Sequence, residues 1–121
     1  MARKIEKFED LEVWKESMSL SVDIYQLLMN CKDFSFKDQI QRSSISIPSN
    51  IAEGYDRQSN KEFIHYLYIA RGSCAEVRTH LYLAKEFNYI DEKNFKNLLD
   101  STQKISAMLF NLIKARRRNF V

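Results

Sequence analysis

The chain has 121 residues, only two glycines and one proline, and a formal net charge of +3 at pH 7. This length predicts a single domain, 1–121, and the scarcity of turn-forming residues excludes a hairpin-rich fold and favours an all-α one. No apolar run approaches the ~20 residues of a membrane helix, and two isolated cysteines, Cys31 and Cys74, predict a reduced, cytoplasmic protein without a membrane partner.

The charge is unevenly distributed along the chain. Residues 8–113 carry 12 basic and 15 acidic side chains, so the body of the protein is mildly acidic. The excess positive charge lies at the two ends. The basic residues there are Arg3, Lys4, Lys7, Lys114, Arg116, Arg117 and Arg118.

The first half of the chain predicts two amphipathic helices, at about 11–30 and 36–57. Asp10 is a suitable N-cap for the first, and the second begins after Ser35. In the first helix, apolar residues at steps of three and four predict one buried face. These residues are Leu11, Trp14, Met18, Val22, Tyr25 and Leu28.

The second half predicts two more helices, at about 60–87 and 92–116. Ser59 and Glu62 form a capping box before the third helix, Asn88 suits its left-handed end, and Asp91 caps the fourth. The third helix has the most regular apolar seam of the chain: Phe63, Leu67, Ala70, Cys74, Val77, Leu81 and Ala84. The fourth predicts an inner face of Phe95, Leu98, Thr102, Ile105, Leu109 and Leu112.

Four helices joined by short loops predict an up-down-up-down four-helix bundle. Because short loops make successive helices antiparallel, the start of the first helix and the end of the fourth lie at the same end. We therefore expect the two basic segments to lie together.

The second helix contains the only proline, Pro48, and one of the two glycines, Gly54. The apolar rhythm continues through Pro48, which predicts a kinked but continuous helix whose freed backbone groups are satisfied by nearby serines. Gly54 predicts either a close approach of another helix or the end of this one.

A polar stripe follows the second helix, and more polar residues interrupt the third. The stripe is either a solvated face or an interfacial network in which Arg42 or Arg57 pairs with Glu53 or Glu76. The predicted network is Gln39, Arg42, Ser46, Asn50 (or Ser49), Glu53, Arg57, Ser73 and Glu76.

The run QIQRS at 39–43, followed by SIPSNIAEG at 46–54, resembles the signature of the 23S ribosomal RNA intervening-sequence proteins. Flanking segments agree, at 8–14, at 69–73 with Glu76, and at 88–90, so the resemblance covers about residues 8–113. It implies a four-helix bundle that assembles into a ring-like homopentamer. Related proteins are accessory factors of diversity-generating retroelements that contact nucleic acid and a reverse transcriptase, and no catalytic activity is established among them.

Residue chemistry gives little support for catalysis or for a cofactor. Glu62 and His65 have the Glu-x-x-His spacing of di-iron bundles, but that site needs a second such motif and further carboxylates, and the chain has only two histidines. Cys74 and His80, six residues apart, point to opposite sides of a helix, so Cys74 is predicted to be structural. We expect no catalytic residue, no metal and no cofactor.

Two functions remain open. In the first, the basic ends, repeated around a ring, bind the phosphates of RNA or DNA without reading sequence. In the second, the ring is a scaffold that recruits another polypeptide, and the basic ends aid solubility or complement the helix dipole. Four tyrosines, Tyr66, Tyr68, Tyr82 and Tyr89, are expected to pack rather than stack on bases, with Tyr68 and Tyr82 available to a second subunit.

Overall fold

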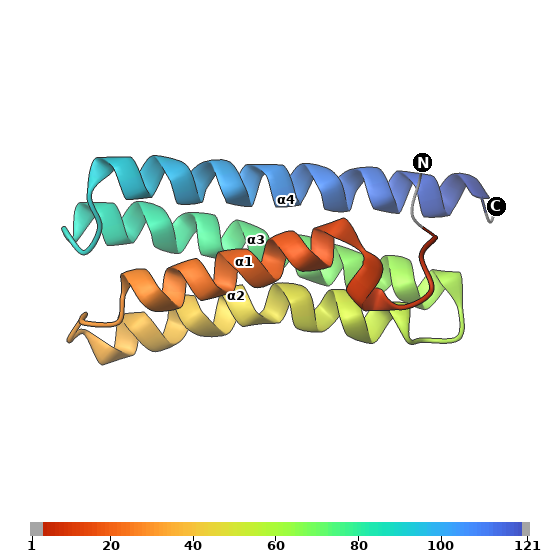
Figure 1. Cartoon of the computed structure of the whole chain (residues 1–121), viewed down its shortest axis with the longest axis horizontal. Coiled ribbons are helices and arrows are strands. Elements are labelled where there is room, and N and C mark those ends of the chain that lie inside the picture. The colour runs from red at the N-terminus through yellow and green to blue at the C-terminus, as the bar shows by residue number, and fades with distance from the viewer. Residues whose placement is uncertain (1–3, 120–121) are drawn as a thin grey trace.

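In the computed structural model, which describes residues 4–119, the chain folds into four α-helices (Figure 1). They are α1 (Glu12–Leu27), α2 (Phe34–Tyr55), α3 (Asn60–Glu86) and α4 (Glu92–Asn119). A short 3-10 helix, η1 (Phe8–Asp10), precedes them, and residues 4–119 contain no strand. The predicted all-α fold is confirmed, and no described helix combines the length and apolar character that a membrane span requires.

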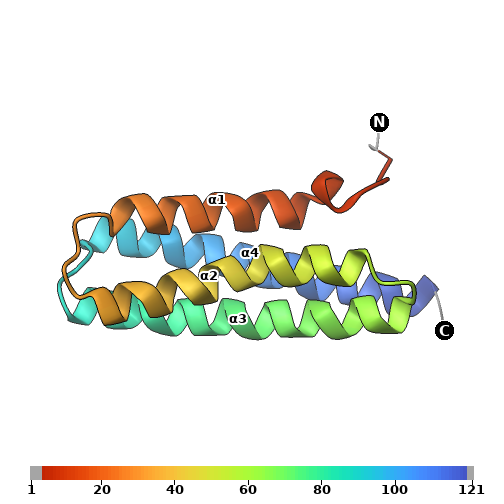
Figure 2. The same ribbon diagram turned by 90° about the horizontal axis from the view of Figure 1, so that it is seen from below.

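Each long helix packs against two neighbours, in the cyclic order α1, α2, α3, α4. Figures 1 and 2 show the four helices side by side along one long axis, with the α2–α3 turn at the same end as both chain termini. Successive helices therefore run antiparallel, as the short loops predicted, and the molecule is an up-down-up-down four-helix bundle.

The core confirms the predicted faces of the second half of the chain. All seven residues of the α3 seam are buried, each no more than 3% exposed. In α4 the predicted inner residues from Phe95 to Leu109 are also buried, but the last inner position is Ile113, 1% exposed, rather than Leu112.

The predicted inner face of the first helix is wrong in its middle, although Leu11 and Leu28 at its two ends are buried as predicted. Met18, Val22 and Tyr25 are 39%, 49% and 54% exposed, and the buried residues of the helix are Val13, Ser17, Leu20 and Ile24. Two apolar stripes satisfy the three-four spacing in this segment, and the true one contains a serine. The Ser17 hydroxyl donates to the carbonyl oxygen of Trp14 at 2.8 Å, and this bond makes its burial tolerable.

The starts of the first two helices also differ from expectation. Asp10 is not the cap of α1, because its carboxylate accepts hydrogen bonds from the backbone N–H of Glu6 and Lys7 and so closes the turn of η1. Leu11 occupies the N-cap position and makes no side-chain capping bond. Helix α2 begins at Phe34, earlier than predicted, because Asp33 caps it by accepting from Phe36 N–H at 3.2 Å.

The other helix ends follow the sequence more closely. Ser59 accepts from Glu62 N–H at 3.1 Å and Asp91 from Asn94 N–H at 2.8 Å, so both predicted caps are confirmed. Asn88 has a φ of 62°, the left-handed conformation expected after α3. Helix α1 ends at Leu27, before the predicted residue 30, whereas α4 continues to Asn119, past the predicted 116.

Helix α2 runs without interruption through Pro48, which is buried. Gly54 lies where α2 closely approaches α3: a Cβ atom there would be 2.5 Å from the Cβ of Tyr66 and 3.2 Å from the Phe63 ring. The close approach predicted for this glycine is therefore confirmed.

Candidate nucleic-acid interface

The polar stripe of α2 faces α3 across a shallow groove. The Ser46 and Ser73 hydroxyls are 2.8 Å apart, and the Asn50 side-chain amide donates to the hydroxyl and the carbonyl oxygen of Ser46. Polar side chains of both helices line this α2–α3 groove. They are Gln39, Arg42, Ser43, Ser46, Ser73, Glu76 and His80.

The ion pairs of this stripe agree only in part with the predicted network. Arg57 pairs with Glu53 at 2.8 Å, as predicted. Arg42 instead pairs with Asp38, one turn earlier on α2, and its side chain is 79% exposed. Glu76 is exposed and forms no salt bridge within residues 4–119. The partner of Arg42 is therefore an aspartate on its own helix and not one of the predicted glutamates, Glu53 or Glu76.

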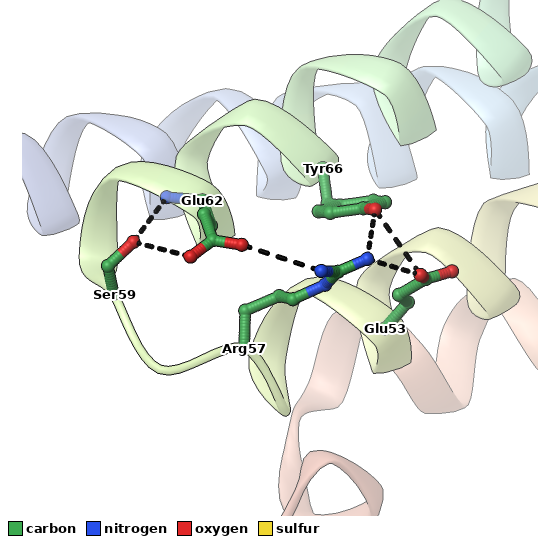
Figure 3. A network of polar contacts seen from close by, with 5 residues as sticks. All are labelled: Glu53, Arg57, Ser59, Glu62 and Tyr66. Atoms are coloured by element: carbon green, nitrogen blue, oxygen red, sulfur yellow. Dashed lines mark hydrogen bonds and ion pairs between the residues drawn. The ribbon is translucent and has the colours of Figure 1, made fainter.

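Arg57 is the centre of a polar cluster at the α2–α3 turn (Figure 3). Its Nη2 donates to the Tyr66 hydroxyl at 2.6 Å, and Nη1 lies 3.5 Å from Glu62 Oε2. Tyr66 in turn donates to Glu53 at 3.2 Å. The hydrogen bond with Glu53 contributes most to a raised pKa of Arg57. This guanidinium is already neutralised by two carboxylates, so the cluster joins α2 to α3 and is poorly suited to bind an anion.

The four predicted cations at the end of α4 have different environments. Arg116 donates from Nε to Asn60 Oδ1 at 2.8 Å, its carbonyl oxygen accepts from the Asn60 amide, and its guanidinium lies 5.0 Å from the centroid of the Phe63 ring. Arg116 therefore fastens α4 to the start of α3.

Lys114 and Arg117, by contrast, lie on the exposed surface against aromatic rings. Lys114 Nζ is 5.4 Å from the Phe110 ring centroid, and the Arg117 guanidinium is 5.3 Å from that of Tyr68. Neither forms a salt bridge with a residue of the described range, and Arg118 is likewise exposed there. These contacts orient the cations through their apolar parts and leave their charge unneutralised.

The N-terminal cations do not join this group. Lys4 and Lys7 are exposed, and Arg3 lies outside the described residues. Figure 2 shows the segment before η1 on the α1 side of the bundle and the end of α4 on the opposite side. Consistently, η1 packs against α1 and α2 only. The two basic segments share one end of the bundle, as predicted, but they are not side by side.

Two further arginines, Arg71 and Arg78, extend the basic surface along α3. The Arg71 guanidinium lies 4.9 Å from the centroid of the same Phe110 ring that Lys114 contacts. Neither arginine was among the site residues predicted from the sequence. The available signal was their spacing of seven residues, which puts both on one helical face.

The titratable core residues are arranged for packing. Cys74 is buried, its thiol donates to the Thr102 carbonyl oxygen at 3.1 Å, and burial raises the pKa of this thiol to about 11. An unreactive structural cysteine is what the seam predicted. His80 Nδ1 instead lies 3.1 Å from the Ser43 hydroxyl. Among residues 4–119, no three His, Cys, Asp or Glu side chains converge as a metal site requires.

The fold and this surface define a class: an all-α four-helix bundle whose α3–α4 side carries cations backed by aromatic rings. A family model described as 23S rRNA-intervening sequence protein matches residues 9–111, and the chain belongs to that family. The resemblance seen in the SIPSNIAEG run is thus confirmed, whereas the link to retroelement accessory proteins stays a prediction.

A crystal structure from Bacteroides thetaiotaomicron VPI-5482 has the same fold. It is described as a protein with unknown function from the S23 ribosomal protein family. The two chains are 32% identical, with a TM-score of 0.79 over 84% of this chain and 98% of that one. No curated protein matches the chain.

Proposed function

We propose that this protein is a non-enzymatic, homo-oligomeric, cytoplasmic protein that binds RNA or DNA through its phosphates. The observation that carries the proposal is the group of exposed cations at the end of α4. Lys114 and Arg117 are each held against an aromatic ring and have no carboxylate partner within the described chain. Cations arranged in this way present charge to a partner rather than to the bundle itself.

Binding of this kind is largely independent of sequence. Lysine and arginine side chains neutralise phosphates and release condensed counterions, so the affinity falls steeply with salt. The membership of a family named for 23S rRNA intervening sequences supports RNA as one partner.

Self-association would bring several copies of these cations together. Exposed apolar side chains on the α1–α2 side of the bundle support self-association. Met18, Val22 and Tyr25, wrongly predicted to face the core, form an exposed apolar surface there, and Met29 and Ile45 extend it, 53% and 55% exposed. A groove between the helices is lined almost entirely by apolar atoms, including those of Trp14 and Pro48. Contiguous apolar surface of this kind marks interaction sites. A second copy of the chain, in a ring of about five, is the proposed occupant.

The same apolar groove also favours a second candidate function, a scaffold that recruits another polypeptide such as a reverse transcriptase. In that case the other polypeptide, rather than a second copy of the chain, would occupy this groove, and the basic α4 end would serve solubility. The two candidates differ in one property, which is the binding of nucleic acid by the purified protein alone.

Filter binding of RNA at several salt concentrations tests the proposal. The informative variant is the triple substitution Lys114→Ala, Arg117→Ala and Arg118→Ala, which spares Arg116 and its contacts with α3. A matched control removes three exposed cations elsewhere: Lys32→Ala, Arg42→Ala and Lys93→Ala.

If the three α4 cations each contact a phosphate of a single strand, the salt slope should fall by about 2 in the first variant and far less in the control. Equal slopes in the two variants would refute the assignment of the α4 end. Absence of binding by the wild-type protein would favour the scaffold.

A further inference from the structure

An open groove of about 340 Å³ lies between α3 and α4. No carboxylate is among its lining residues, and five of the six come from one side of α3. The lining residues are Tyr68, Arg71, Gly72, Ala75, Arg78 and Ser106.

Gly72 indicates that the groove is kept open. A Cβ atom at this position would meet nothing within 4 Å, unlike one at Gly54, so no packing contact requires a glycine here. Glycine destabilises the interior of a helix relative to alanine. The structural effect of Gly72, together with the small Ala75, is to leave the floor of the groove low enough for another chain to approach.

Arg71 is held in place at one side of this floor. Its Nε donates to the Ser106 hydroxyl at 3.3 Å, and its guanidinium stacks on Phe110. It forms no salt bridge with any described residue, so its remaining N–H donors and its charge are unmatched within residues 4–119. A guanidinium presents paired donors that match the oxygens of a phosphate.

Arg78 is the second cation of the groove, about 10.5 Å further along α3 at 1.5 Å per residue. Its Nε is buried without a hydrogen-bond partner, and it too forms no salt bridge with a residue between 4 and 119. A buried donor without a partner is costly, and native structures rarely retain one without a reason. The side chain as a whole is only partly buried and lines the groove, so an anionic ligand there would neutralise its charge.

The groove is continuous with the cations at the end of α4. Phe110 contacts both Arg71 and Lys114, and Tyr68 borders the groove while its ring contacts Arg117. Four cations and two exposed aromatic rings therefore follow one track over α3 and α4. Binding sites for single-stranded nucleic acid combine a cationic groove that follows the backbone with aromatic side chains beside it.

We propose that the α3–α4 groove binds the sugar–phosphate backbone of single-stranded nucleic acid, with phosphates on Arg71 and Arg78 and the strand leading to Lys114 and Arg117. This assignment rests on the proposed nucleic-acid function and names the surface that performs it. It moves the centre of binding from the helix ends to the side of the bundle.

The test is fluorescence anisotropy with a labelled RNA of twenty uridines. The variant Arg71→Gln with Arg78→Gln removes both groove cations, and Arg42→Gln with Lys93→Gln removes the same charge from other surfaces. We expect the groove variant to bind at least tenfold more weakly at moderate salt, with a salt slope lower by about 1.4. The control should change affinity less than twofold. Thermal melts of both variants verify that the bundle remains folded.

A second variant, Gly72→Leu, fills the groove without changing any charge. Because the position is open and leucine is a better helix former, this protein should be at least as stable as wild type yet bind the RNA several-fold more weakly. Unchanged binding by Gly72→Leu, or equal losses in the two charge variants, would overturn the groove assignment and leave diffuse charge as the cause.

Three other outcomes also refute the groove assignment. If the groove variants change the oligomer mass measured by light scattering, the groove is an interface between copies of the chain. If the wild-type protein binds RNA and the groove variants bind equally well, this inference fails and the proposed function stands. If the wild-type protein binds no nucleic acid, both fail together.

Discussion

The Ser21 hydroxyl of α1 donates to the carbonyl oxygen of Ser44 in α2 at 3.0 Å. Ser44 is the residue whose carbonyl loses its helical partner at Pro48, because proline has no N–H to donate four residues later. The bond lost within α2 is thus replaced by a bond from the neighbouring helix. This explains how a buried proline is accommodated in an uninterrupted helix, and it also fixes the register of α1 against α2.

Ser21→Ala should therefore destabilise the protein by about 1 to 3 kcal/mol, the cost of leaving a partly buried carbonyl without a donor. Ser19→Ala, an exposed serine on the same helix, should change stability by less than about 0.5 kcal/mol. Urea denaturation measures both.

A double-mutant cycle with Pro48→Ala isolates the cause. Alanine at 48 supplies the missing N–H, so Ser21→Ala should cost much less in that background. Equal costs in both backgrounds would show that the hydroxyl does not compensate for the proline.

The two glycines of the chain should respond to alanine in opposite directions. At Gly54 the new Cβ would lie 2.5 Å from the Tyr66 Cβ, so α2 and α3 must separate. Overpacking costs about 1 to 3 kcal/mol, and the gain in helix propensity offsets only part of it. At Gly72 nothing is within 4 Å, and alanine should stabilise the helix by about 0.5 to 1 kcal/mol. Melting temperatures that move in the same direction would contradict this assignment.

The ion pair between Glu53 and Arg57 should contribute little to stability. The two side chains are 54% and 41% exposed, and exposed pairs contribute about 0 to 1 kcal/mol, whereas breaking a buried pair costs about 3 to 5 kcal/mol. Chemical denaturation of Glu53→Ala should therefore show a loss of at most about 1 kcal/mol. A loss above 3 kcal/mol would show that this pair is buried in the assembled protein.

His80 should make the protein less stable in weak acid. Partial burial lowers the pKa of this imidazole below its ordinary value, and the charge of Glu76 acts in the opposite direction. The unfolded chain then binds a proton more readily than the folded one, so the stabilisation is complete above about pH 6.5 and is lost as the pH falls.

Denaturation midpoints at pH 7.5 and 5.5 test this effect. The wild type should lose more stability between the two values than His80→Gln, and the comparison cancels the contributions of other groups. Equal losses would mean that the folded and unfolded chains bind this proton equally.

The sequence predicted the buried face of a helix correctly where only one set of apolar residues has helical spacing. In α3 one apolar seam is unambiguous, and every predicted core residue is buried. In α1 two stripes compete, and the choice depends on Ser17, whose burial requires a local hydrogen bond that spacing does not reveal. Ser21 is similar, since its partner carbonyl lies on another helix and becomes free only because of Pro48.

The candidate site was predicted less well than the fold. The cations at the end of α4 were identified by their density, but the separate role of Arg116 depends on Asn60 and Phe63, distant in sequence. The groove between α3 and α4 combines residues about 35 positions apart. Arg71 and Ser106 meet only because the two helices are antiparallel. The spacing of residues within one helix does not show which residue of a neighbouring helix they will contact.

The most direct measurement is native mass spectrometry of the purified protein, alone and with the RNA of twenty uridines, combined with anisotropy at increasing salt. We expect an assembly of about five 14.4 kDa chains that binds the RNA, with an affinity that falls log-linearly as salt rises. A monomer that leaves the RNA unbound at micromolar concentration and low salt would contradict it.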